Sequence, residues 1–338
     1  MGSYYAIVVD GASEDDAEEI QAKIQAILID INRQMSTWDT ESEISKFNQS
    51  KGFDWFSVSP GFFQVVQESI RLHKLTNGVF DPTLAPVIDV WGFGAQKPRS
   101  FPTQLEIDEA KARTGMRFVE VRSEPPSIRR TRDGITLTLS AIAPGYASDR
   151  VSQLLESLGF PSHSVDIGGE IKVGLAKFSG GKWRLGIESP LGGIRRVMEF
   201  TERSIATSGD YRNYFEYKGV RYSHTIDPAT ARPVVNPPSS VSILSDSAMT
   251  ADGLATSLMV MGVEKGMSFA KQHKLSVLFL DVVDGHTIVE HATGEFLTSE
   301  LPAATPISPV VTVAIFLLAA GAAAIVLLSR KSSVTFGV

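Results

Sequence analysis

The sequence predicts an α+β fold with mixed or antiparallel sheets and packed helices, followed by one C-terminal transmembrane helix. Segments with helical periodicity are interspersed with short strands of alternating character, and EYKGVRY is typical of an antiparallel hairpin. A regular βαβ fold would instead alternate strands and helices throughout. The C-terminal prediction comes from residues 310–328, VVTVAIFLLAAGAAAIVLL, which carry no charge.

Local signals define the first elements. Residues 4–9 (YYAIVV) are typical of a strand. A helix is expected over 14–34, with Ser13 as its N-cap and acidic residues in its first turn, where the helix dipole favours them. Its predicted buried face carries Ile20, Ile24, Ile27 and Ile31. A second helix is expected over 60–76, with proline in its first turn and Asn77-Gly78 after its end.

The remaining elements complete the body of the protein. Further helices are expected over 104–114, 142–158, 247–261 and 264–273. Strands are expected over 117–122, 134–139, 164–173, 183–188, 196–201, 212–217, 220–225, 240–245 and 275–281. Pro144 is compatible with its helix only in the first turn.

Composition excludes several kinds of chemistry. The chain has 338 residues, a formal net charge of −6 and no cysteine, which excludes disulfides, thiolate metal sites, Fe–S clusters and a cysteine nucleophile. Arg330 and Lys331 are the only charged residues after residue 302, so without these two positive charges the first 302 residues carry a net charge of −8. An acidic body lacks the basic surface that nucleic acids need, and we expect no nucleic-acid partner.

Residues 310–328 predict a membrane span. A helix of this length extends about 28 Å, close to the roughly 30 Å of a hydrocarbon core. The alternative is a buried core helix, but the apolar character of every face and the basic residues just after it favour the membrane. The sequence therefore predicts an anchor at its C-terminal end.

The positive-inside rule places Arg330 and Lys331 in the cytoplasm and the body on the outer side of the membrane. The expected organisation is a body at 1–302, a linker at 303–309, the span at 310–328 and a short cytoplasmic tail at 329–338. Export requires an N-terminal signal, and the first ten residues show no such pattern. Either the signal lies outside this sequence or the topology rule does not apply.

Two side chains with oxygen atoms lie near the start of the helix expected over 247–261. Asp252 and Thr256 are four residues apart and therefore lie on one helix face. A carboxylate and a hydroxyl are ligands suited to Mg²⁺, but an acidic residue in a first helical turn is also an ordinary capping residue. The spacing alone leaves both interpretations open.

Three other segments carry candidate chemistry. Residues 140–146 (SAIAPGY) join a strand to a helix, so they offer N–H groups to a phosphate and carbonyls to a cation, or form an ordinary turn. In residues 165–170 (VDIGGE), paired glycines allow close backbone approach or a bulge. His224 follows a hydroxyl residue and precedes Asp227, so it is either a general base or a structural histidine at a strand end.

Familiar phosphate-loop, dinucleotide-binding, zinc-protease and serine-hydrolase motifs do not occur in the sequence. Five aromatic residues in loop-like surroundings can stack on a flat ring or belong to the core. They are Trp38, Phe80, Trp91, Phe93 and Tyr146.

Seven ordered segments carry a resemblance to a known family. They are MSTWDTESEISKFN (35–48), GVFDPTLAPVIDVWGFG (78–94), SAIAPGYASD (140–149), VDIGGE (165–170), SIATSGDY (204–211), HTIDPATARP (224–233) and AMTADGLAT (248–256). In this order they resemble the ApbE family of FAD:protein FMN transferases over about residues 1–300. The resemblance implies an ApbE-like α+β domain that binds FAD and Mg²⁺, transfers the FMN moiety to a Thr or Ser hydroxyl of an acceptor protein, and releases AMP.

The resemblance also implies roles for individual residues. Metal ligands would come from the side chains of Asp252 and Thr256 and from the Ala141 carbonyl. Contacts to FAD are implied for Met1, Trp38, Val79, Phe80, Asp81, Thr138, Pro144 and Ile226. His224 is our candidate for the base that takes the proton of the acceptor hydroxyl, assisted by Asp252.

Two positions depart from the family pattern. Pro144 stands where a basic residue is common, which removes a cation and a backbone donor. Thr138, three residues before Ala141, stands where an acidic residue is common. Two alternatives therefore stay open: a Mg²⁺-dependent FAD pyrophosphatase that yields FMN and AMP, and a non-catalytic membrane-tethered FAD-binding protein.

The resemblance implies flavin-carrying acceptor subunits of membrane electron-transfer complexes. Candidates are Na⁺-pumping NADH:quinone reductase, the related Rnf complex and a regulator of nitrous-oxide reduction. Combined with the predicted anchor, it implies a bacterial inner-membrane location with the catalytic domain on the periplasmic side. An anchored enzyme would gain effective concentration by sharing the membrane with its acceptors.

Overall fold

A computed structural model describes residues 4–94, 101–210, 214–217, 219–298, 327–329 and 333–337. Its largest element is a sheet with the strand order β16-β15-β14-β9-β6-β5-β1-β18-β17, in which neighbouring strands are antiparallel. Its strands are β1 (Tyr5–Asp10), β5 (His163–Ile167), β6 (Glu170–Val173), β9 (Ser204–Gly209), β14 (Ser240–Ser245), β15 (Ser276–Val283), β16 (Thr287–Ala292), β17 (Leu327–Ser329) and β18 (Ser333–Gly337).

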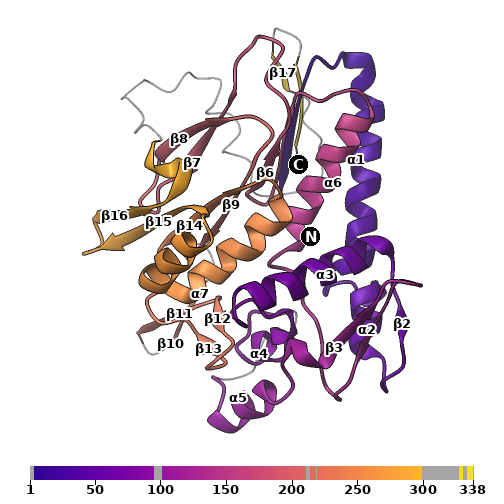
Figure 1. Cartoon of the computed structure of the whole chain (residues 1–338), viewed down its shortest axis with the longest axis vertical. Helices are drawn as coiled ribbons and strands as arrows, with labels where there is room; N and C mark the ends of the chain where they lie inside the picture. Colours follow the sequence, from indigo (N-terminus) through magenta and orange to yellow (C-terminus); the bar gives the residue numbers. More distant parts are fainter. Residues whose placement is uncertain are drawn as a thin grey trace.

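Three long helices cover one face of this sheet (Figure 1). Helices α6 (Ala143–Ser157) and α7 (Ala248–Gln272) pack on the strands and on each other, and α1 (Glu14–Met35) packs on α6. Gly262 has φ 72° and ψ 176°, which interrupts α7. The interruption agrees with the two helices expected over 247–261 and 264–273.

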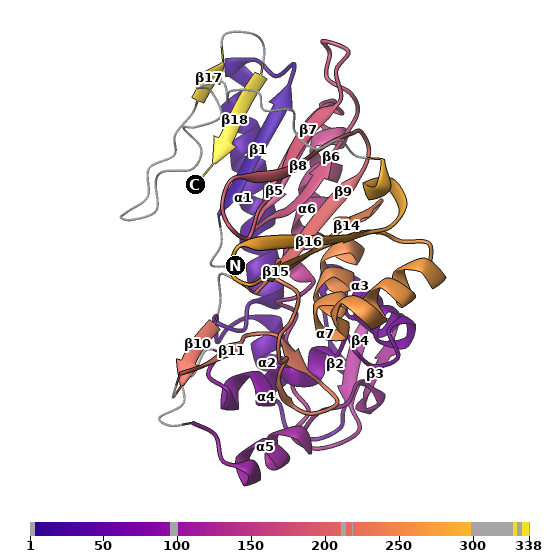
Figure 2. The same cartoon turned by 90° about the vertical axis from the view of Figure 1, so that its left-hand side faces the viewer.

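The smaller helices and most of the small sheets lie around one end of α7, below the large sheet in Figure 2, whereas the hairpin of residues 183–200 lies beside the large sheet higher in that view. The helices are α2 (Glu43–Gln49), α3 (Pro60–Leu75), α4 (Ala85–Val90) and α5 (Gln104–Lys111), with short 3₁₀ turns η1 (Pro82–Leu84), η2 (Met116–Phe118) and η3 (Gly294–Leu297) elsewhere along the chain. The small sheets are β2-β4-β3, β7-β8, β10-β11 and β12-β13. Their strands are β2 (Phe56–Ser57), β3 (Val119–Arg122), β4 (Ser127–Arg130), β7 (Trp183–Glu188), β8 (Ile194–Phe200), β10 (Tyr214–Tyr217), β11 (Val220–Ser223), β12 (Ile226–Asp227) and β13 (Arg232–Pro233).

Alternating strand residues supply two hydrophobic clusters, one on each face of the large sheet. In β15, Phe279 belongs to the helix-side cluster, whereas Leu278 and Leu280 belong to the hairpin-side cluster beneath β7–β8. A third cluster, the α4–α5 cluster, contains Leu84, Val87, Trp91, Ile107, Ala110, Ile226 and Ala231. The body is therefore one α+β unit with three connected cores.

Local capping signals predicted the long helices well. Ser13 accepts the Asp16 N–H and forms a capping box at α1, and α3 begins at Pro60 as expected. Strand β14 has the predicted bounds. By contrast, α2, β9 and β16 were not predicted.

Two strand predictions are wrong, each for a local reason. Residues 134–139 form no strand, because the Asn48 side-chain amide occupies both backbone groups of Leu137 with hydrogen bonds of 2.8 Å. The strand expected over 164–173 is a hairpin, because Gly168 and Gly169 turn the chain at φ 74° and 104°.

The predicted span over 310–328 lies outside the described residues, except for Leu327 and Leu328 in β17. Residues of β18, in the predicted tail, pair with β1. Within the described residues, no helix combines the length and apolar character that a membrane crossing requires. The division of the chain at 302, 309 and 328 stays a prediction.

Candidate active site

A cavity of about 580 Å³ lies where the three hydrophobic clusters meet. Phe80 of the helix-side cluster lines it, as do Ile187 of the hairpin-side cluster and Ile226 of the α4–α5 cluster. Because each wall is part of a packed core, the cavity has a fixed shape.

One part of the lining is apolar. It contains Val79, Phe80, Leu84, Ile88, Leu185, Ile187, Ile205 and Ile226. Such side chains suit the face of an aromatic ring system, because contact with them removes apolar surface from water.

Acidic residues form another part of the lining. Five carboxylates line the cavity, and none of the described lining residues is Lys or Arg. The acidic residues are Asp81, Asp166, Glu170, Glu188 and Asp252. A phosphate-bearing ligand would meet only repulsion from these side chains unless a cation accompanied it.

Asp252 is the most buried of these acids, with 5% of its surface exposed. Its Oδ2 accepts the Gly145 N–H at 3.1 Å, and this is the only hydrogen bond of its carboxylate within the described residues. Burial raises the pKa of Asp252 from 3.8 to about 7, although the Gly145 N–H opposes the rise. Oδ1 is thus available to a ligand in the cavity.

Glu170 adds negative charge close by. Its burial, together with the charges of Asp252 and Asp166, raises the pKa of Glu170 well above its ordinary value of 4.5. A cation between such carboxylates would remove much of this mutual repulsion.

Thr256 lies one helical turn after Asp252 and also lines the cavity, as does Ala141. The Thr256 Oγ1 lies 3.3 Å from the Ser208 Oγ of β9. No three His, Asp or Glu side chains in the described parts of the chain converge closely enough to hold a metal ion alone. Asp252, Thr256 and Ala141 offer a carboxylate, a hydroxyl and a backbone carbonyl, which are oxygen donors of the kind that Mg²⁺ takes together with waters and substrate phosphates.

His224 reaches the cavity from the loop between β11 and β12. Its ring meets the edge of Phe93, with centroids 6.4 Å apart. Buried Trp91 fixes both flanks of this loop, since its ring stacks on Tyr222 at 5.8 Å and its Nε1–H donates to the Ala231 carbonyl at 2.9 Å. The contacts of Trp91 on both sides of His224 thus fix the position of the segment that carries it.

Val79, Phe80 and Asp81 enter the cavity wall directly after α3. The Phe80 N–H donates to the Thr76 Oγ1 at 3.0 Å, and Asp81 accepts the Thr83 N–H at 2.8 Å. Burial raises the pKa of Asp81, and its hydrogen bonds with Thr83 oppose the rise. These contacts fix the backbone of this wall.

A second cavity of about 340 Å³ adjoins this wall and shares Val79 and Asp81 with the main cavity. Lys111 and Arg117 line it. Lysine and arginine side chains are therefore present next to the main cavity but not in its described lining.

Most of the site residues expected from the sequence come together in the main cavity. They are Val79, Phe80, Asp81, Thr138, Ala141, Pro144, His224, Ile226, Asp252 and Thr256. Trp38 is not brought there: it is 70% exposed in the turn between α1 and α2, because no neighbouring side chains cover it. Met1 lies outside the described residues.

Sequence reasoning missed several lining residues. Asp166 and Glu170 flank the Gly168-Gly169 turn, and reading that pair as a hairpin turn would have placed both acids at the same sheet end. Ser208 lies within residues 204–211, which resemble the family, but nothing local distinguishes it from its neighbours. No local signal marks Glu188, at the end of β7.

Together these features define an α+β ligand-binding protein with an apolar cavity wall and oxygen ligands beside it. The chain belongs to the ApbE family, whose sequence profile matches residues 1–279.

Two similar relatives are both named "FAD:protein FMN transferase". An "FAD:protein FMN transferase" of Vibrio cholerae serotype O1 is 41% identical over 301 residues, which cover 88% of this chain and 89% of the relative. One of Haemophilus influenzae is 34% identical and covers 87% of this chain and 88% of its own.

Solved structures agree in fold. The flavin transferase ApbE of Vibrio cholerae superimposes with a TM-score of 0.80 at 38% identity, covering 89% of this chain and 96% of that one. The apo flavinyl transferase ApbE of Pseudomonas stutzeri gives a TM-score of 0.78 at 33% identity, covering 88% and 93%.

Proposed function

We propose that this protein is a Mg²⁺-dependent FAD:protein FMN transferase that attaches FMN through a phosphoester bond to a Thr or Ser hydroxyl of an acceptor flavoprotein. The observation that carries the proposal is the cavity itself. It joins an apolar wall to five carboxylates, with no Lys or Arg in its described lining, in a chain whose relatives are named for this reaction. An aromatic dinucleotide bound with a divalent cation satisfies both parts.

The Asp252 carboxylate, the Thr256 hydroxyl and the Ala141 carbonyl would hold Mg²⁺. The ion would neutralise charge on the FAD diphosphate and polarise the phosphorus that is attacked. The buried Asp252 suits this role, because its Oδ1 is available and its charge is unfavourable without a cation. The apolar residues Val79, Phe80 and Ile226 would take a ring of FAD.

In the transfer step, the acceptor hydroxyl oxygen attacks the phosphorus on the FMN side of the diphosphate. The new P–O bond forms as the bond to the bridging oxygen breaks, and AMP leaves with that oxygen and its electron pair. His224, which lines the cavity on its braced loop, accepts the hydroxyl proton. FMN is left on the acceptor as a phosphoester.

Product analysis separates this proposal from the two alternatives. The protein is incubated with FAD, Mg²⁺ and an acceptor flavoprotein domain, and AMP, free FMN and protein-bound flavin are quantified. AMP equal to protein-bound flavin supports a transferase. AMP with an equal amount of free FMN indicates a pyrophosphatase, and FAD recovered intact indicates a binding protein; either result contradicts the proposal.

We also propose that the acceptors are flavin-carrying subunits of membrane redox complexes, and that residues 310–328 anchor the enzyme in the bacterial inner membrane with its body in the periplasm. The charge-free run before Arg330 and Lys331 supports this arrangement. Pairing of β18 with β1 would keep residues 333–337 on the same side as the body, so insertion requires that β18 leave β1.

Single cysteines test this topology, because the chain has none of its own. Lys182→Cys reports on an exposed loop of the body and Val334→Cys on the tail. In intact cells with a permeabilised outer membrane, a membrane-impermeant maleimide should label the first and spare the second. Labelling of both would favour the β1–β18 pairing and contradict the anchor.

A further inference from the structure

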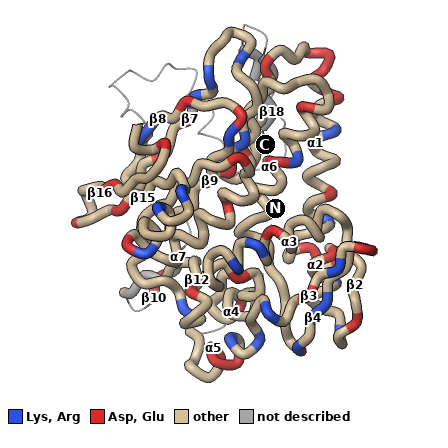
Figure 3. The backbone as a smooth tube through the Cα atoms, in the orientation of Figure 1, with Lys and Arg blue, Asp and Glu red and all other residues tan. Residues whose placement is uncertain are grey.

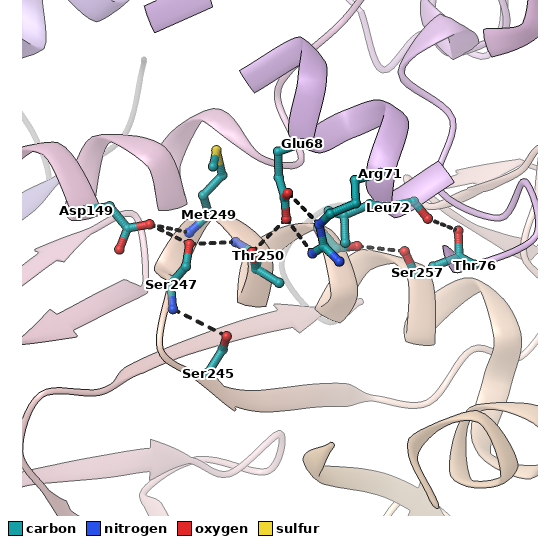
Figure 4. A network of polar contacts seen from close by, with 11 residues as sticks. Glu68, Arg71, Leu72, Thr76, Asp149, Ser245, Ser247, Met249, Thr250 and Ser257 are labelled. Carbon is teal, nitrogen blue, oxygen red and sulfur yellow. Dashed lines mark hydrogen bonds and ion pairs between the residues drawn. The ribbon is translucent and has the colours of Figure 1, made fainter. Parts of the chain in front are cut away.

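Asp149, which does not line the cavity, links α7, which carries Asp252 and Thr256, to α6, which begins two residues after Ala141. It lies on α6, and its carboxylate accepts three hydrogen bonds at the start of α7, of which Figure 4 draws those from Ser247 and Met249. The donors are the Ser247 hydroxyl at 2.7 Å, the Ala248 N–H at 2.9 Å and the Met249 N–H at 3.0 Å.

The link runs in both directions. Asp252 of α7 accepts the N–H of Gly145, in the first turn of α6, at 3.1 Å. The first turn of each helix thus donates to a carboxylate of the other helix, and this satisfies N–H groups that have no partner inside their own helix. The two helix starts are held in one fixed relation.

Helix α7 already has an N-cap of its own. The Ser247 Oγ accepts the Thr250 N–H at 3.2 Å, as an ordinary cap does. Asp149 therefore adds something that a cap within α7 cannot supply, namely attachment to a neighbouring helix. Only a carboxylate suits this task, because its two oxygens can accept three donors and an amide oxygen replaces only one of them.

The two helices also approach each other closely at their first turns. A Cβ atom on Gly145 would lie 2.3 Å from the Ala248 carbonyl oxygen, so the helices touch at their backbones. Asp252 and Thr256 follow within two turns on α7, whereas Ala141 and Pro144 lie beside the start of α6. A shift between the helices would change the spacing of the proposed metal ligands.

We propose that Asp149 is a positioning residue that sets the geometry of the Mg²⁺ site by holding α7 against α6. This inference rests on the proposed function, since it assigns Mg²⁺ to Asp252, Thr256 and Ala141. Partners that orient metal ligands typically change metal affinity by about 10- to 100-fold when they are replaced.

The test compares Asp149→Asn with Ser13→Ala, which removes the cap of α1 and leaves the cavity untouched. Two quantities are measured: the Mg²⁺ concentration for half-maximal FMN transfer, and the rise in unfolding temperature that Mg²⁺ causes in the presence of FAD. For Asp149→Asn we expect at least a tenfold higher half-saturating Mg²⁺ concentration and a smaller rise. Ser13→Ala should lower the unfolding temperature without changing the response to Mg²⁺.

An unchanged Mg²⁺ response in Asp149→Asn, with a lower unfolding temperature, would overturn the inference and leave Asp149 as a purely structural cap. Transfer by the parent protein that is independent of Mg²⁺ would instead contradict the proposed function itself. If Asp149→Asn does not fold, Ser247→Ala, which removes one of the three donors to the Asp149 carboxylate, is expected to show the same direction of change.

Discussion

The negative charge of buried Asp252 destabilises the metal-free protein, and the pH dependence of its stability measures this effect. Burial raises its pKa from 3.8 to about 7. Between these values the folded protein keeps a proton that the unfolded chain has lost, so the free energy of unfolding falls as pH rises from about 4 to 7. Above pH 7 the full penalty of the buried charge is present.

Asp252→Asn should therefore stabilise the metal-free protein at pH 8. Without a charge to bury, its free energy of unfolding should exceed that of the parent by on the order of 2 kcal/mol at pH 8 and by little at pH 4. Thermal unfolding in EDTA at both pH values checks this, with exposed Asp54→Asn as the control. Mg²⁺ with FAD should stabilise only the parent; parallel pH curves for both proteins would contradict the account.

Pro144 removes a possible cation from the cavity wall, and Pro144→Lys would supply one. One new charge-assisted contact to the diphosphate should lower the KM for FAD and the half-saturating Mg²⁺ concentration by roughly three- to tenfold. Pro144→Gln, which restores the N–H without a charge, is the matched control. Equal effects of Lys and Gln would show that the charge is irrelevant.

At the scale of elements, the contact between α6 and α7 is the most constrained feature near the cavity. Gly145→Ala places a methyl group against the Ala248 backbone, which cannot retreat as a flexible side chain would. We expect a loss of about 1–3 kcal/mol in stability and a clear loss of FMN transfer. Gly181→Ala, where only Ser179 lies near the added atom, should change neither unfolding temperature nor activity.

The elements also show what sequence patterns reveal. Helices α1 and α3 were predictable because their N-terminal signals and apolar spacing are local, whereas α6 has no side-chain cap and was predictable from its sequence pattern alone. Residues 135–139 alternate like a strand and bury Ile135, but the partner of their backbone is the Asn48 side chain, far away in the sequence. Strand β9 is central, and its small side chains give no alternation.

The same division applies to the candidate site. Asp252, Thr256 and His224 were identifiable because each lies in a recognisable local segment. Glu170 and Ser208 also lie in segments that resemble the family, but their place in the site depends on sheet pairing, which brings β5, β6 and β9 together. Trp38 lies in a segment that resembles the family, but its side chain is exposed and does not line the cavity. The resemblance alone therefore did not predict its position relative to the cavity.

At the scale of the whole molecule, the cavity draws its described lining from residues between Tyr4 and Val260. Acidic and basic side chains are interspersed along the described backbone (Figure 3). None of the described lining residues lies in the proposed anchor at residues 310–328, so the anchor would serve to place the enzyme near its acceptors.

Deletion of residues 303–338 should leave FMN transfer to a detached, soluble acceptor domain unchanged. Transfer to the acceptor in its membrane should fall by on the order of 100-fold, because the advantage of a shared membrane is lost. Initial rates with both acceptors, for the full and the shortened chain, check this. An equal loss with both acceptors would mean that the C-terminal segment supports the catalytic body, for instance through β18.

The most direct test of the central claim is mass spectrometry of the acceptor after incubation with FAD and Mg²⁺. The account predicts that the acceptor gains the mass of one FMN on a single Thr or Ser, with one AMP released per flavin attached. His224→Ala should bind FAD but leave the acceptor unmodified. An acceptor without added mass despite AMP release, or full modification by His224→Ala, would contradict it.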